Sequence, residues 1–172
     1  MTPVVVLVGP PGAGKTTVAA LVAERLGLAV RDTDLDVEAS TGSTIQELFV
    51  DHGEAHFRRL EAEAVATALR EHDGVLALGG GAVLDDGTRA LLADHHVVYL
   101  EVGLADASRR VGLGSARPLL LGNVRGRLKK LMDERAPVYR EVSRRTVATN
   151  GLTPDQVADA VLSGLQHEEP TA

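Results

Sequence analysis

The chain is 172 residues long, 44% hydrophobic and 24% charged, with a net charge of −6 and no cysteine, so we expect one domain with a full core. The negative charge argues against general affinity for nucleic acid or anionic membranes, and the absence of cysteine excludes disulfides, thiolate metal sites and cysteine nucleophiles. No apolar run approaches the ~20 residues of a membrane span, and the first residues lack the layout of a signal peptide, so we expect a monomeric cytoplasmic domain of enzyme size that binds neither nucleic acid nor membrane.

The segment 9–16 reads GPPGAGKT and matches the pattern G-x-x-x-x-G-K-[ST]. It follows the apolar run 4–8, which predicts a buried strand, and precedes 17–26, where the apolar residues have helical spacing. A phosphate-binding loop requires this strand–loop–helix context. Its glycines and the helix N-terminus direct backbone N–H groups at phosphate oxygens, Lys15 can reach the β- and γ-phosphates, and the Thr16 hydroxyl can bind Mg²⁺. The alternative is a glycine-rich turn that only joins a strand to a helix, but the pattern would arise by chance about once per tens of thousands of positions.

Apolar runs alternate with amphipathic stretches along the rest of the chain. This alternation predicts an α/β protein, a three-layer α/β/α sandwich around a central five-stranded parallel sheet. Ligands of such sheets bind beyond the carboxyl ends of the strands. Beyond the first strand and helix, strands are predicted at 28–32, 75–78, 97–100 and 146–149, and helices at about 54–71, 85–94, 104–111, 124–143 and 154–166.

Two helix starts can be recognised locally. Thr44 and Glu47 have the spacing of a capping box, which would open a short helix. Thr153 followed by Pro154 places a cap residue before a first-turn proline and would open the last helix.

Asp32 and Asp34 follow the second predicted strand. If the backbone is still extended there, both carboxylates lie on one face, and one could join the Mg²⁺ shell while the other meets a substrate hydroxyl. The alternative is an N-cap pair, because Asp34 precedes a short helical stretch that ends near Gly42. Beside a phosphate-binding loop, we favour the functional interpretation.

Two further clusters contain candidate site residues. Arg58 and Glu61 are three residues apart and can form an intrahelical ion pair, although such pairs are usually solvated surface pairs. The glycines at 79–81 follow a predicted buried strand and permit very close backbone approach. We favour bare backbone N–H groups that face a bound anion or hydroxyl over a simple turn.

The segment 112–122 reads GLGSARPLLLG, which indicates a mobile lid that carries the cation Arg117, or alternatively a plain surface loop docked by its leucines. Further on, Arg135 stands just ahead of Pro137, which we interpret as a helix-breaking proline. The histidines show no metal-ligand pattern, so no transition-metal site is predicted.

Together these motifs resemble the shikimate kinases, a family of small P-loop kinases with the nucleoside monophosphate kinase fold. The resemblance covers about 3–165, and the order and spacing of the motifs are more specific than any one of them apart from the P-loop. It implies ATP-dependent phosphorylation of the 3-hydroxyl of shikimate, giving shikimate 3-phosphate and ADP in chorismate and aromatic amino acid biosynthesis. The motifs are GPPGAGKT at 9–16, DTD at 32–34, FRRLE at 57–61, GGGAV at 79–83, RPLL at 117–120 and RAPVY at 135–139.

The resemblance also implies a role for each matching residue. The cofactors would be ATP, bound by Gly12, Ala13, Gly14, Lys15, Thr16, Thr17, Arg110, Arg117 and Pro154, and Mg²⁺, arranged by Thr16 and Asp32. Shikimate would be bound by Asp34, Phe49, Phe57, Arg58, Glu61, Gly79, Gly80, Gly81 and Arg135. In this scheme Lys15, Asp34 and Arg117 are catalytic, with Asp34 orienting or deprotonating the attacking hydroxyl, while Arg58 and Arg135 bind the shikimate carboxylate. Glu61 would hold Arg58, the two phenylalanines would wall the carbocycle, and Arg109 competes with Arg110 for the position beside the adenine.

We expect a single kinase domain over 1–172. Within it the core sheet and P-loop would occupy 1–32, a substrate-binding region about 33–62, a lid about 112–123 and a flexible tail about 167–172. Two alternatives are a gluconate-type or other small-molecule kinase on the same fold, and a nucleotide-binding module without catalysis. The combination of the DTD, FRRLE, GGG and RAPVY motifs favours the shikimate kinase interpretation over both.

Overall fold

The computed structural model describes residues 2–112 and 123–167. Its strands form one five-stranded sheet in the order β2-β3-β1-β4-β5, and every neighbouring pair is parallel. The predicted sheet is therefore confirmed, with β1 and β2 beginning one and two residues later than expected. The strands are β1 (Val5–Val8), β2 (Val30–Asp32), β3 (Val75–Ala77), β4 (Val97–Glu101) and β5 (Arg145–Ala148).

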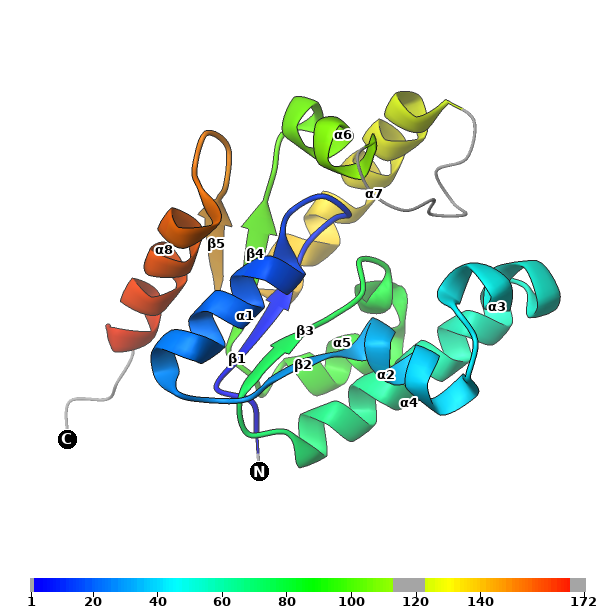
Figure 1. Cartoon of the computed structure of the whole chain (residues 1–172), viewed down its shortest axis with the longest axis horizontal. Coiled ribbons are helices and arrows are strands. Elements are labelled where there is room, and N and C mark those ends of the chain that lie inside the picture. The colour runs from blue at the N-terminus through cyan, green and yellow to red at the C-terminus, as the bar shows by residue number, and fades with distance from the viewer. Residues whose placement is uncertain (1, 113–122, 168–172) are drawn as a thin grey trace.

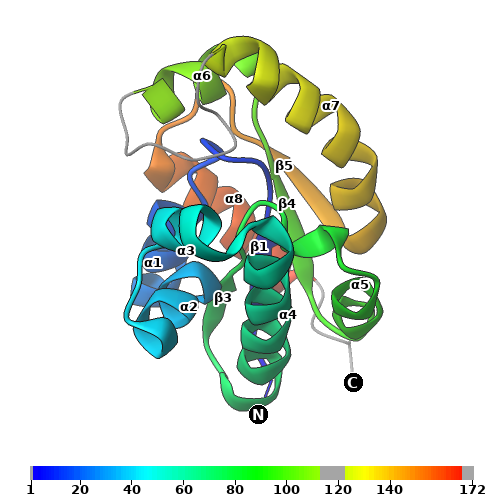
Figure 2. The same ribbon diagram turned by 90° about the vertical axis from the view of Figure 1, so that its right-hand side faces the viewer.

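Helices cover both faces of the sheet (Figures 1 and 2). The predicted capping box of α3 and the predicted Thr153 cap of α8 are both present, and Thr153 forms a capping box as well, because Thr44 and Thr153 each exchange two hydrogen bonds with the third helical residue. The helices are α1 (Lys15–Leu26), α2 (Thr33–Thr41), α3 (Ile45–His52), α4 (Glu54–Glu71), α5 (Asp86–Leu92), α6 (Leu104–Gly112), α7 (Val124–Val142) and α8 (Pro154–Gln166), and a short 3₁₀ turn, η1, spans Ala82–Leu84.

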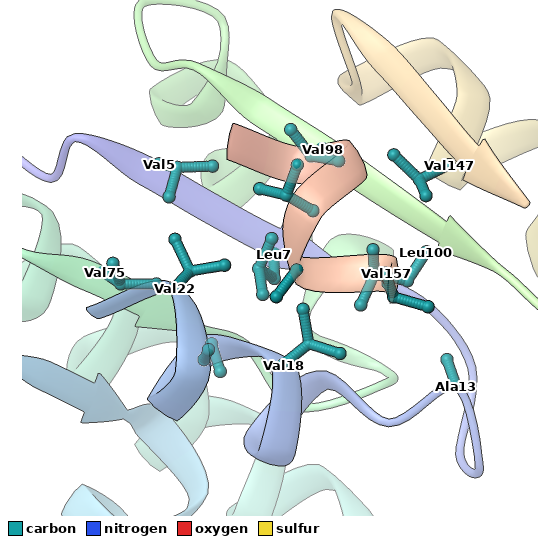
Figure 3. Packing of buried hydrophobic residues seen from close by; sticks show 14 of the residues in the cluster. Val5, Leu7, Ala13, Val18, Val22, Val75, Val98, Leu100, Val147 and Val157 are labelled. Atoms are coloured by element: carbon teal, nitrogen blue, oxygen red, sulfur yellow. The ribbon is translucent and has the colours of Figure 1, made fainter. Parts of the chain in front are cut away.

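The central strand β1 is buried on both faces, which explains why it reads as an uninterrupted apolar run. Because side chains alternate along a strand, Val5 and Leu7 face α1 and α8, whereas Val6 and Val8 face the opposite layer with α4 and α5. Figure 3 shows the first of these cores, where the β1 side chains meet Val18 of α1. This packing anchors α1, whose first residues end the loop at 9–16.

A smaller cluster ties α2 and α3 to the N-terminal half of α4. Val37, Leu48 and Phe57 are buried together, one from each of the three helices. The two short helices lie beside α4 in both views (Figures 1 and 2). This arrangement gives the region after β2 a hydrophobic core of its own and fixes it to the end of the sheet.

One condition posed from the sequence is not met, and one local expectation is wrong. The chain does not stay extended through Asp34, because α2 already begins at Thr33 with Asp32 as its N-cap. Pro137 does not break a helix, because α7 continues through it to Val142. A helix-interior proline loses one backbone hydrogen bond, and burial of α7 side chains before and after it, Arg135 and Tyr139 among them, holds the helix together.

Within 2–112 and 123–167, none of the helices is both long and apolar enough to cross a membrane. The predicted lid at about 112–123 and the tail at about 167–172 fall almost wholly outside the described residues, and Arg117 lies outside them too.

Candidate active site

The loop between β1 and α1 has the predicted strand–loop–helix geometry. Gly14 is the N-cap of α1 and has a φ of 87°, in the left-handed region that favours glycine. Gly12 has a φ of 83°, and a Cβ atom there would lie 2.8 Å from the carbonyl oxygen of Ala107. The loop therefore requires glycine at both positions, once for the backbone turn and once for the close approach of α6.

Two cations lie against this loop. Lys15 Nζ donates to the carbonyl oxygens of Gly9 at 2.7 Å and Pro10 at 3.0 Å. Arg110 Nη1 donates to the carbonyl oxygen of Gly12 at 3.0 Å.

The neighbouring Arg109 lies elsewhere. It pairs with Asp106 at 3.2 Å, and its side chain is 67% exposed. Of the two adjacent arginines that compete in the sequence, Arg110 is the one that reaches the loop.

A pocket of about 350 Å³ opens between this loop and the carboxyl ends of β2 and β3. The position agrees with the ligand site expected of a parallel sheet. Most of the residues predicted to hold nucleotide and metal line it, together with Asp34 and two of the three glycines. The lining residues are Gly12, Gly14, Lys15, Thr16, Thr17, Asp32, Asp34, Leu78, Gly79, Gly80, Arg110 and Val111.

Asp32 caps α2 and also contacts Thr16, so the cap and the metal interpretation of this residue are compatible. Its Oδ1 accepts a hydrogen bond from the Asp34 N–H at 2.9 Å and so caps α2. Its Oδ2 accepts one from the Thr16 hydroxyl at 3.0 Å. A hydroxyl and a carboxylate oxygen fit Mg²⁺, which ordinarily takes one or two protein oxygens and completes its shell with waters and substrate phosphates.

Arg58 and Glu61 form a partly buried ion pair, not a solvated surface pair. Arg58 Nη1 donates to Glu61 Oε1 at 2.7 Å, and the two side chains are 22% and 4% exposed. Burial raises the pKa of Glu61 above its ordinary value of 4.5, and the Arg58 guanidinium opposes that shift. The guanidinium also lies 5.3 Å from the centre of the Phe57 ring.

The glycines after β3 allow these charged groups to reach the backbone. A Cβ atom on Gly81 would lie 2.5 Å from Arg58 Cζ, and one on Gly79 would lie 2.5 Å from Asp34 Oδ1 and 2.8 Å from Glu61 Oε2. The two carboxylates therefore gather at Gly79, and the Asp34 charge contributes to the raised pKa of Glu61.

The same glycines differ in their backbone amides. The Gly79 N–H donates to the Thr33 hydroxyl at 3.3 Å, so it is not a bare amide. The N–H groups of Gly80 and Gly81 donate no hydrogen bond to any residue in 2–112 and 123–167. The interpretation of bare N–H groups therefore applies to Gly80 and Gly81 only.

Arg135 approaches this cluster from α7. It is buried, and its charge lowers the pKa of Glu61 against the larger effect of burial. One turn further, the Tyr139 hydroxyl donates to the Gly80 carbonyl oxygen at 2.6 Å. The two arginines predicted to act together are thus near the same carboxylate, although 77 positions of sequence separate them.

Sequence reasoning did not single out Thr33 or Tyr139 as site residues. Thr33 is the middle residue of the DTD motif, and it is fully buried under the glycine loop. Tyr139 follows Arg135 at a spacing of four, which on a helix places both side chains on one face. That spacing was the available signal for Tyr139.

The remaining predicted residues are not among those that line the pocket. Phe49 and Phe57 have ring centroids 5.0 Å apart, with Phe57 buried and Phe49 packed on the same cluster. Ala13 is a buried residue of the loop itself, and Pro154 is the exposed first residue of α8.

Comparison with known proteins gives one consistent result. The chain matches the family described as "Shikimate kinase" over residues 11–166. It is 62% identical to a shikimate kinase of Salinispora arenicola over 158 residues, which cover 92% of this chain and 95% of the relative. It is 58% identical to one of Streptomyces avermitilis over 167 residues, covering 97% and 98%. A solved structure of shikimate kinase from Acinetobacter baumannii in complex with shikimate superposes with a TM-score of 0.93 at 35% identity, covering 98% of this chain and 95% of that one.

Proposed function

The chain belongs to the shikimate kinase family, and on that premise we propose how its site transfers the γ-phosphoryl group of ATP to the 3-hydroxyl of shikimate. The products are shikimate 3-phosphate and ADP. One observation carries the proposal: the pocket beside the phosphate-binding loop is also lined by Asp34 and Gly79, and Gly79 lies against Glu61, the partner of Arg58. A phosphate donor and a hydroxylated carboxylate can therefore meet in one cavity.

ATP binds along the loop between β1 and α1. The N–H groups at the start of α1 and the positive end of the helix dipole stabilise the phosphates. Phosphate oxygens replace the carbonyls of Gly9 and Pro10 as acceptors for Lys15. Arg110, which is hydrogen-bonded to Gly12, lies beside the adenine, and Pro154 covers its other side.

Thr16 and Asp32 would hold Mg²⁺. When bound, the ion neutralises negative charge on the β- and γ-phosphates during transfer. Asp32 also caps α2 through the Asp34 N–H, so the residue that would hold the metal fixes the position of Asp34 as well.

Arg58 and Arg135 bind the carboxylate of shikimate. Guanidinium groups match a carboxylate in geometry and charge. Glu61 orients Arg58 through their 2.7 Å hydrogen bond. Phe57 lies next to Arg58 on α4, and together with its ring partner Phe49 on α3 it offers an apolar wall to the shikimate ring.

Asp34 orients the attacking hydroxyl and accepts its proton. It lines the pocket at the start of α2, between the loop and the glycines. Transfer then requires little beyond positioning and charge stabilisation. Arg117 would add a further cation at the γ-phosphate from the lid at about 112–123, which would also exclude water as a competing acceptor.

An acceptor-dependence assay tests the function. ADP release should depend on shikimate and should be negligible with gluconate or with no acceptor, and ³¹P NMR of the product should identify a 3-phosphate. Turnover with gluconate would instead support the related small-molecule kinase, and nucleotide binding without turnover would support a non-catalytic module.

We further propose that the chain acts as a monomer in the cytoplasm, where its nucleotide is available. We also propose that the chain forms one kinase domain in which residues 33–62 are the substrate-binding region.

A further inference from the structure

Tyr139 connects the helix that carries Arg135 to the glycine loop. Its side chain is 1% exposed, and its hydroxyl donates a hydrogen bond to the carbonyl oxygen of Gly80 at 2.6 Å. Such a short, partly buried hydrogen bond between residues 59 positions apart in sequence fixes the separation of their segments closely.

The surroundings of Tyr139 keep its hydroxyl protonated, so that it can donate a hydrogen bond. Its ring stacks on Tyr99 of β4, with centroids 5.1 Å apart and an interplanar angle of 25°. Burial raises the pKa of Tyr139 to about 12, against the opposing effect of Arg135. The hydroxyl therefore stays protonated across the neutral range.

The bond to Gly80 fixes the direction of an amide that the substrate can use. None of the described peptide bonds is cis, so the Gly80 carbonyl and the Gly81 N–H share one plane and point in opposite directions. Neither the Gly80 nor the Gly81 N–H has a hydrogen-bond acceptor among residues 2–112 and 123–167. Backbone turn bonds from the Ala82 N–H to the Gly79 carbonyl oxygen and from the Leu84 N–H to the Gly81 carbonyl oxygen, both at 3.1 Å, shape this loop, and the Tyr139 bond ties its central peptide to α7.

Arg135 and Tyr139 are one helical turn apart, and α7 continues between them through Pro137. The Arg135 charge lies near the Tyr139 hydroxyl and opposes the rise in its pKa. One turn of α7 thus positions both a cation and the glycine loop.

We propose that Tyr139 is a positioning residue for the acceptor substrate. It fixes the position of the Gly80–Gly81 peptide relative to Arg135. The shikimate ring and carboxylate are then held in one orientation toward the γ-phosphate. The proposal rests on the function proposed above. Tyr139 donates to Gly80 and not to the loop at 9–16 that would bind the phosphates, so its larger effect should be on the acceptor.

The test compares Tyr139→Phe with Tyr99→Phe. Each variant removes one hydroxyl from the same stacked ring pair, but only the first removes a bond to Gly80. We expect Tyr139→Phe to raise the KM and the calorimetric Kd for shikimate about tenfold or more, because the Gly80 carbonyl is left without its donor. The KM for ATP should stay within about twofold of wild type. Tyr99→Phe should leave both constants close to wild type.

Three results would overturn the proposal: unchanged shikimate constants in Tyr139→Phe, equal losses for shikimate and ATP, or equal effects of the two substitutions. If Tyr139→Phe does not fold, ¹³C NMR of the wild-type protein provides the test. The chain has two tyrosines and therefore two ¹³Cζ signals, and the signal that is lost in Tyr99→Phe identifies which is which. Shikimate added without nucleotide should shift the Tyr139 signal more than that of Tyr99, and an unmoved Tyr139 signal would overturn the proposal. A wild-type enzyme without shikimate-dependent turnover would instead overturn the proposed function.

Discussion

Arg58 donates a hydrogen bond to Glu61 at 2.7 Å, and the accepting Glu61 side chain is only 4% exposed. The two residues are three apart on α4, where such pairs are ordinarily exposed and weak. Here burial removes the solvent that screens most surface pairs. The pair is therefore suited to hold a guanidinium in a fixed orientation.

The first prediction concerns Arg58. Arg58→Ala should raise the KM for shikimate by at least about tenfold and change the KM for ATP far less, because a charged hydrogen-bond donor to the substrate carboxylate is lost. Steady-state kinetics with each substrate varied in turn measures the two KM values separately. The matched control is Arg59→Ala, since Arg59 is the exposed neighbour and contacts His56 instead. Equal increases in both KM values would contradict a substrate-specific arginine.

The second prediction concerns Glu61 and pH. Burial raises the pKa of Glu61 above 4.5 in the folded chain, so the folded state binds this proton more tightly than the unfolded state. The resulting stabilisation is present below the unfolded pKa and is lost as pH rises through the folded pKa. Relative to Glu61→Gln, which does not titrate, the wild type should therefore lose stability as pH rises from about 4.5.

Denaturant unfolding of both proteins across this pH range measures the difference. A difference independent of pH would contradict the raised pKa. Glu61→Gln should also raise the KM for shikimate, since an amide holds Arg58 less strongly than a carboxylate. Glu47→Gln is a suitable control, because Glu47 is an exposed capping-box residue on α3 and a glutamine preserves the box.

Much of the fold could be predicted because the signals are local. The apolar runs that became β1, β3 and β4 are buried on both faces, and the P-loop pattern marks the start of α1. The predicted bounds of the helix at 54–71 agree with α4 to the residue. The order of the motifs indicates the family without reference to the geometry.

Most of the features that the sequence does not reveal depend on tertiary contacts. The start of α2 at Thr33 is local, because Asp32 caps the helix, but the Thr33 hydroxyl accepts a hydrogen bond from the N–H of Gly79, 46 residues away in sequence. Pro137 stays helical because buried side chains on α7 outweigh one lost hydrogen bond. The bond from Tyr139 to Gly80 follows from the packing of α7 against η1, which no local pattern encodes.

The third prediction concerns Asp34. Asp34→Asn should lower kcat by roughly 10²-fold, because the amide cannot accept the proton of the attacking hydroxyl. The cap of α2 is provided by Asp32 and is unaffected, so the fold should be retained. Asp36→Asn is the matched control, since Asp36 lies in the same first turn and pairs with Arg31 at 2.6 Å. An effect of Asp34→Asn confined to KM would leave Asp34 with binding alone.

The fourth prediction concerns Gly81. Its φ is negative, so alanine is permitted by the backbone, but the added Cβ would lie 2.5 Å from Arg58 Cζ. The guanidinium must then move and loses its geometry with Glu61. Gly81→Ala should therefore raise the KM for shikimate by about tenfold while the KM for ATP stays within about twofold. Gly87→Ala on the exposed side of α5 is the control, because its Cβ would meet only Asp85. If Gly81→Ala were kinetically silent, Arg58 would be free to bind the carboxylate from another position, and the close packing of Gly81 against Arg58 would have no bearing on substrate binding.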